Sequence, residues 1–143
     1  MQQIAFGGEK HERLEISVAG YERAASGDYH DDNWLRVNVS IAAGAFRGSF
    51  SATFQAAELF DLCTDLSRLH ETLSGRVRFE TLEDQLSLEF IGNGRGSIEL
   101  QGEALDQSGI GNKLIFAIQL DQTQLHQSLQ SLRVAVAAFP IRT

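Results

Sequence analysis

The chain has 143 residues, of which 43% are hydrophobic and 22% are charged, the balance of a globular domain rather than of a disordered segment. Its net charge of −7 argues against nucleic-acid binding, because such binding neutralises phosphates with clustered Lys and Arg side chains. The single cysteine excludes an intrachain disulfide, residues 1–8 lack the character of a signal peptide, and the longest apolar run, residues 134–139, is too short for a membrane span.

The first predicted elements are strands, because apolar and polar residues alternate with the two-residue period of a half-buried sheet. This alternation covers residues 14–21 and 34–41 and, after a turn around Gly44, residues 46–54. Residues 24–33 combine Gly, Asp and His side chains between the first two strands, so they predict a polar loop.

The period of the pattern then changes from two to between three and four. Apolar side chains follow one helical stripe: Leu59, Leu62, Cys63, Leu66, Leu69 and Leu73. This spacing predicts an amphipathic helix over about residues 56–73, with its charged side chains towards water. Gly75 follows closely and is the predicted left-handed terminator of the helix.

Alternation returns in the second half of the chain and predicts four more strands. They cover residues 77–79, 86–90, 98–104 and 114–120. Asn93-Gly94 predicts a hairpin between the second and third of these strands, because both residues tolerate the positive φ angles of a tight turn.

A second amphipathic helix is predicted over about residues 122–138. Asp121 is the expected cap, and Gln124 completes a pattern similar to a capping box. Pro140 ends the helix. The apolar stripe of this helix consists of Leu125, Leu129, Leu132, Val136 and Phe139.

Together these elements predict an α+β fold in a single domain spanning residues 1–143. We expect a mainly antiparallel sheet of about 7–8 strands, with both helices packed on one face, because two amphipathic helices need an apolar surface and a sheet that is apolar on one face supplies it. The composition further predicts a cytoplasmic protein with neither nucleic acid nor a membrane as its partner.

No group of residues predicts a reaction centre or a bound cofactor. The loop aspartates and His30 lack the Gly and the trailing Glu of a calcium loop, and the four histidines are scattered, so no metal site is expected. The glycine-rich residues 92–96 join two strands, whereas a phosphate-binding loop opens a helix. Cys63 lies on the apolar stripe, which predicts a buried, unreactive thiol. We therefore expect a non-enzymatic protein without metal or cofactor.

The polar face of the predicted sheet allows two interpretations. Trp34 and the four arginines Arg36, Arg47, Arg76 and Arg78 should point outward, and they have carboxylate or amide partners on neighbouring strands: Glu80, Glu89, Glu99, Gln101 and Glu103. A solvated surface with weak ion pairs explains these charges. An interaction surface is the alternative, because Trp and Arg are enriched in binding hot spots.

Two parts of the chain resemble the WapI family of bacterial immunity proteins. In the first, Asp32-Asn33-Trp34-Leu35 opens a strand, and Gly44 to Phe54 leads into the leucine-striped helix that ends at Ser74-Gly75. In the second, residues 96–102 (GSIELQG) are followed by residues 114–123 (LIFAIQLDQT), which lead into Leu125. The similarity covers about residues 30–135.

The resemblance implies an immunity protein, which binds and neutralises the toxic domain of a contact-dependent toxin. For the namesake of the family that toxin is a tRNA-cleaving nuclease. A nuclease presents a basic substrate cleft, which an acidic inhibitor can occupy as a phosphate mimic. On this hypothesis the expected partner-binding residues are Asp28, Asp31, Asp32 and Trp34.

Two other functions stay open. The chain could be a structural or interaction domain, for example a homodimer joined through an exposed sheet edge. It could also bind a small ligand, or act as an enzyme, in a pocket between sheet and helices. The residue pattern indicates no particular oligomeric state.

Overall fold

The computed structural model describes residues 1–8 and 11–143. Within these residues the strands are β1 (Gln2–Gly7), β2 (Glu12–Tyr21), β3 (Trp34–Ala43), β4 (Phe46–Gln55), β5 (Ser74–Glu80), β6 (Leu86–Asn93), β7 (Ser97–Leu105) and β8 (Lys113–Asp121). The helices are α1 (Tyr29–Asp32), α2 (Ala56–Thr72) and α3 (Gln122–Ala138).

The strands form two antiparallel sheets of four, with the orders β1-β2-β3-β4 and β5-β6-β7-β8. Each sheet is a simple meander, and a long helix follows it: α2 after the first sheet and α3 after the second. The α+β class, the antiparallel pairing and the two amphipathic helices are therefore confirmed. The division into two sheets is a finding that the strand pattern does not contain, because alternation reports which residues face inward and not which strands are neighbours.

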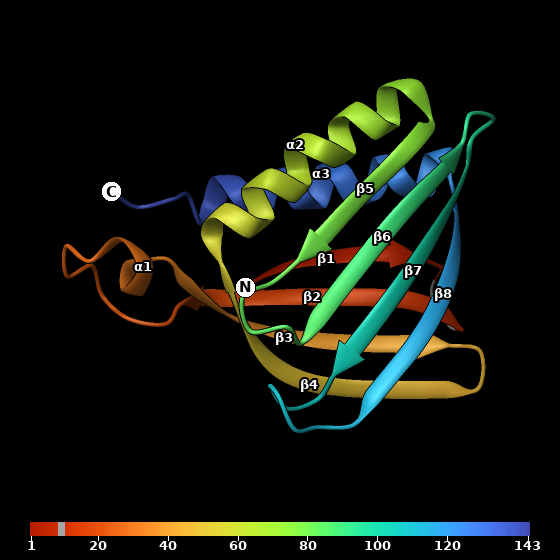
Figure 1. The fold of residues 1–143 in the computed structure, drawn as a ribbon. Helices are drawn as coiled ribbons and strands as arrows, with labels where there is room; N and C mark the ends of the chain where they lie inside the picture. Colours follow the sequence, from red (N-terminus) through yellow and green to blue (C-terminus); the bar gives the residue numbers. More distant parts are fainter. Residues whose placement is uncertain (9–10) are drawn as a thin grey trace.

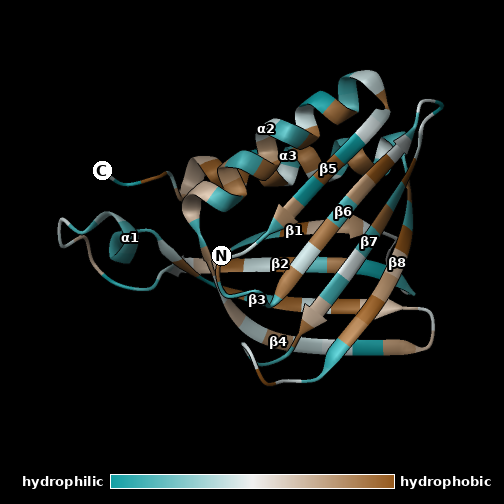
Figure 2. Cartoon of the chain, viewed as in Figure 1, coloured by the Kyte–Doolittle hydropathy of each residue, from teal (hydrophilic) through white to brown (hydrophobic). Residues whose placement is uncertain are grey.

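The two sheets cross one another, and the long helices lie side by side along one flank of the molecule (Figure 1). Helix α2 packs against β5, α3 packs against β1, and the two helices also contact each other. Hydropathy alternates along the strands, as expected for sheets with one buried and one exposed face (Figure 2). The apolar faces of both sheets and both helices therefore share one core.

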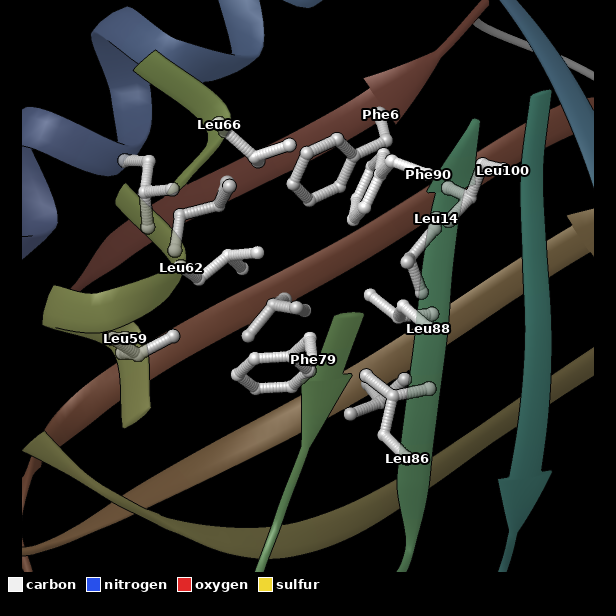
Figure 3. Packing of buried hydrophobic residues seen from close by; sticks show 14 of the residues in the cluster. Phe6, Leu14, Leu59, Leu62, Leu66, Phe79, Leu86, Leu88, Phe90 and Leu100 are labelled. Atoms are coloured by element: carbon white, nitrogen blue, oxygen red, sulfur yellow. The ribbon is translucent and has the colours of Figure 1, made fainter. Parts of the chain in front are cut away.

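Aromatic side chains join the two sheets in that core (Figure 3). The rings of Phe6 on β1 and Phe90 on β6 have centroids 5.3 Å apart, and those of Phe54 and Phe79 are 5.4 Å apart. A buried Leu or Phe of this kind contributes about 1.5–3 kcal/mol to the free energy of unfolding. These rows of apolar side chains therefore dominate the stability of the fold.

The ends of the long helices confirm one sequence prediction and correct another. The Asp121 carboxylate accepts a hydrogen bond from the Gln124 backbone N–H at 2.7 Å, and the Gln124 side chain accepts one from the Asp121 N–H at 3.0 Å, so the capping box of α3 is confirmed. Helix α2 is terminated by its cap residue Leu73, which has the left-handed φ of 59°, and not by Gly75, which lies in β5. Leu73 takes this conformation while its side chain packs against the core and its carbonyl accepts from the Gly94 N–H at 2.6 Å.

Candidate partner-binding surface

The connection between β2 and β3 is a folded loop that contains the short helix α1 (Figure 1). Asp28 caps α1, because its carboxylate accepts a hydrogen bond from the Asp31 backbone N–H at 3.0 Å. The sequence predicts a polar loop here. The structure adds that polar side chains of the loop itself, such as Asp28, give it a defined conformation. We refer to residues 22–33, between these two strands, as the acidic loop.

The Asp32 side chain is buried and accepts hydrogen bonds from other residues of the acidic loop. It is 4% exposed, and its carboxylate accepts hydrogen bonds from the backbone N–H and hydroxyl of Ser26 and from the backbone N–H of Gly27, each at 2.8 Å. Burial by itself would raise the pKa of this carboxyl, but these hydrogen bonds, together with the nearby Arg142 guanidinium, hold it below its usual value. Of the four residues predicted to bind a partner, Asp32 is therefore the buried one, and its carboxylate binds loop groups and not solvent.

Arg142, near the C-terminal end of the chain, also forms hydrogen bonds with the acidic loop. Asn33 is 1% exposed, and its side-chain amide donates hydrogen bonds to the carbonyls of Tyr29 at 2.7 Å and of Arg142 at 2.9 Å. The Arg142 guanidinium donates to the carbonyls of Asp32 and Arg23, and it lies 3.8 Å above the centroid of the Tyr21 ring. The acidic loop is thus anchored by a residue more than a hundred positions away in the sequence.

Arg142 contributes to this surface although the sequence does not predict it. No local pattern marks it, because its partners lie on a loop that only the tertiary fold brings near the C-terminus. The one available signal is the cluster Phe139-Pro140-Ile141-Arg142, in which an aromatic and a cationic side chain follow the end of α3. In the structure Phe139 packs edge-on against Tyr21, with ring centroids 5.8 Å apart.

The remaining predicted residues lie at the surface of the acidic loop. Asp28 and Asp31 are exposed, and Tyr29 between them is 48% exposed. Arg23 lies 3.7 Å from the Asp31 carboxylate, so one of these charges is partly compensated. Trp34 begins β3, is half-buried, and has Gln55 of β4 opposite it. The loop therefore presents two exposed carboxylates and a Tyr side chain, with the partly exposed Trp34 ring at its base.

The outer face of the second sheet bears the predicted ladder of cross-strand charges. The Glu89 carboxylate accepts hydrogen bonds from Arg76 at 2.6 Å and from Arg78 at 2.9 Å, and Glu99 accepts from Gln101 and Gln119. The arginine side chains are about two-thirds exposed, so each pair contributes little to stability, at most about 1 kcal/mol. A shallow hollow on this face is lined by Arg78, Glu89, Gln101 and Ile115, among others.

The acidic, histidine and cysteine side chains on the described part of the chain do not gather into a metal-binding group. Within residues 1–8 and 11–143, no group of three or more His, Cys, Asp or Glu side chains is arranged to hold a metal ion. Cys63 is partly buried beside the core, less deeply than expected, and burial raises the pKa of its thiol despite the nearby Arg133. None of the described helices combines the length and apolar character needed to cross a membrane.

Comparisons with known proteins concern the family and the fold of the chain. The model of the family described as "Immunity protein WapI-like family" matches residues 4–140. No curated protein matches the chain. A solved structure described as "Crystal structures of trypanosoma bruciei MRP1/MRP2" superimposes with a TM-score of 0.50 at 10% sequence identity, covering 95% of this chain and 83% of that chain. At this identity the likeness concerns the fold alone.

Proposed function

This chain belongs to the WapI-like family of immunity proteins, and we propose that it binds and neutralises one cognate toxin domain, of the tRNA-cleaving type, without catalysing a reaction. Family membership carries the immunity role, and the resemblance described above suggests the toxin class. The net charge of −7 fits a partner with a basic substrate cleft, because opposite charges steer the encounter of two proteins.

The acidic loop is the proposed contact surface for the toxin. Asp28 and Asp31 supply exposed negative charge, and Trp34 and Tyr29 supply aromatic area next to it. Hydrogen bonds accepted by the Asp32 carboxylate and donated by the Asn33 and Arg142 side chains hold this surface in one conformation. A preorganised loop loses less conformational entropy on binding than a flexible one, which favours high affinity.

Co-expression with a candidate toxin from a neighbouring gene tests the proposal. The toxin should arrest growth when it is expressed alone, and the intact chain should restore growth and co-purify with the toxin. A catalytically inactive toxin is the control. It should co-purify with the chain from cells whose survival does not depend on immunity. If the chain neither restores growth nor co-purifies, the immunity function is wrong for that pair.

Reversal of the loop charges locates the contact surface in the same assay. The double variant Asp28→Lys, Asp31→Lys should protect cells less well than the intact chain. The matched control Asp61→Lys, Glu71→Lys makes the same change in net charge on exposed positions of α2 and should protect fully. Equal protection by both variants would keep the immunity function but place the contact surface elsewhere.

A further inference from the structure

Strand β8 is an open edge of the second sheet. Within the described residues its backbone pairs with β7 alone, whereas the opposite edge strand, β5, packs against α2. Figure 1 shows β8 along the outer border of its sheet. An edge strand presents a row of unpaired backbone N–H and C=O groups, which another strand can complete.

The side chains of β8 do little to protect this edge. Its two charged residues, Lys113 and Asp121, stand at the two ends, and the seven residues between them are uncharged. Ile115 is 71% exposed on the outer face of the strand, and Ala117 is also exposed. Protected edges usually carry a charge, a proline or a bulge in the middle of the strand, so β8 lacks the common devices that prevent strand pairing.

The sequence of β8 is complementary to itself in the antiparallel direction. If two copies of the strand pair about Ala117, each Lys113 faces the Asp121 of the other copy, and Ala117 faces Ala117. Leu114 faces Leu120 and Phe116 faces Ile118, so buried side chains meet buried or half-buried ones. Ile115 faces Gln119, and both are exposed on the outer face. The charges therefore favour one register, and the pleat is compatible with it.

We propose that two copies of this chain associate through β8, with a two-fold axis at Ala117 that joins their second sheets into one continuous sheet. A two-fold contact uses the same surface on both copies, which a self-complementary strand provides. The opposite charges at the ends of the strand favour this register over shifted ones, because a shift separates Lys113 from Asp121. Within one chain Lys113 also lies 3.9 Å from Glu103 and the Asp121 carboxylate caps α3, so each charge would be shared between two partners. The acidic loop lies elsewhere in the fold, between β2 and β3, so this association is independent of the proposed toxin contact.

Sedimentation or light scattering on the intact chain tests this dimer. The wild-type protein should show a mass twice the 15.8 kDa of one chain at high concentration and dissociate on dilution. Ala117→Glu places two carboxylates opposite each other and should weaken the dimer by about tenfold or more. Ala117→Lys should do the same, and a mixture of the two variants should form dimers again, because residue 117 then meets an opposite charge.

The matched control is Ser49→Glu, which adds the same charge on the outer face of the other open edge strand, β4, and should leave the dimer intact. Circular dichroism of each variant checks that it is folded. A wild-type chain that stays monomeric over roughly a hundredfold range of concentration overturns the proposal. A dimer that neither charge at position 117 weakens, or variants that do not recombine, would also overturn it.

Discussion

Asn33 and Arg142 exchange hydrogen bonds in both directions: the Arg142 backbone N–H donates to the Asn33 side-chain carbonyl at 2.7 Å, and the Asn33 amide donates to the Arg142 carbonyl at 2.9 Å. Asn33 ends α1 just before β3, and Arg142 lies after the end of α3. The pair therefore couples the conformation of the acidic loop to the docking of the C-terminal residues.

Arg142→Ala should loosen the acidic loop. The variant loses the guanidinium hydrogen bonds to two loop carbonyls, which should lower the free energy of unfolding by about 1–3 kcal/mol. Amide hydrogen exchange of residues 22–33 should accelerate, while exchange in β6 and β7 should change little. Arg95→Ala, in the exposed turn after β6, is the matched control and should leave exchange in the loop unchanged. Equal exchange in both variants would contradict the anchoring role.

Asp32→Asn should destabilise the protein at neutral pH. An Asn amide can replace one oxygen acceptor, but its NH₂ group would face a loop N–H donor. Because the pKa of Asp32 is lowered on folding, its carboxylate adds stability above the unfolded-state pKa of about 3.9, and this stability is lost as the pH falls through the folded-state pKa.

The difference in melting temperature between the wild type and Asp32→Asn should therefore be largest near pH 7 and shrink below about pH 4. Asp61→Asn, an exposed position on α2, should melt like the wild type at neutral pH. A difference that grows on acidification would show that the Asp32 carboxylate does not stabilise the loop.

Leu129→Ala should be among the more destabilising substitutions in α3. Leu129 is fully buried, and removing its side chain leaves a cavity in the core, at a cost of about 2–5 kcal/mol in the free energy of unfolding. Val134→Ala, on the exposed side of the same helix, should cost less than about 0.5 kcal/mol. Denaturant unfolding of both variants measures the contrast, and similar midpoints would contradict the docking of this face of α3.

Cys63 should react with a thiol reagent more slowly in the native protein than after unfolding. The thiol is partly buried between core side chains, and burial raises its pKa, so less of the reactive thiolate is present at neutral pH. Labelling kinetics with and without denaturant give the two rates, with Cys63→Ala as the unreactive control. Native labelling as fast as labelling of the unfolded chain would reopen a nucleophilic role for this residue.

Charge reversal in the acidic loop should act on the rate of toxin binding. Asp31→Lys should slow association and flatten its dependence on salt, because surface charges steer the encounter over about one Debye length. Trp34→Ala should instead speed dissociation, since aromatic anchors act mainly on the lifetime of a complex. Surface plasmon resonance at low and high salt separates the two effects, and Glu71→Lys on α2 is the control for charge alone.

The local sequence predicted much of the secondary structure. The alternation at residues 34–41 and the leucine stripe at residues 59–73 correspond to β3 and α2, and the Asp121 cap forms as expected. Each of these signals acts between residues a few positions apart, because strand and helix periods determine directly which side chains share a face. The short strand β1 and the four-residue helix α1 were not predicted individually, since each contains too few residues to establish a period.

The candidate site was only partly predictable, because burial within a loop depends on the course of its backbone. Composition drew attention to Asp28, Asp31 and Asp32, but only the tertiary structure distinguishes the buried Asp32 from its two exposed neighbours. The three aspartates are chemically identical, and the difference arises from where the loop backbone turns its N–H groups.

By itself, the sequence determined which face of the strongly periodic strands and of the two long helices is buried, and through its resemblance it indicated the family. The tertiary structure alone decided that the strands divide into two crossing sheets, that Arg142 anchors the acidic loop, and that β8 is left at an open edge. These features depend on contacts between segments far apart in the chain. Such contacts form because together they bury the apolar surfaces of all the strands and helices. The period of a single segment carries no information about them.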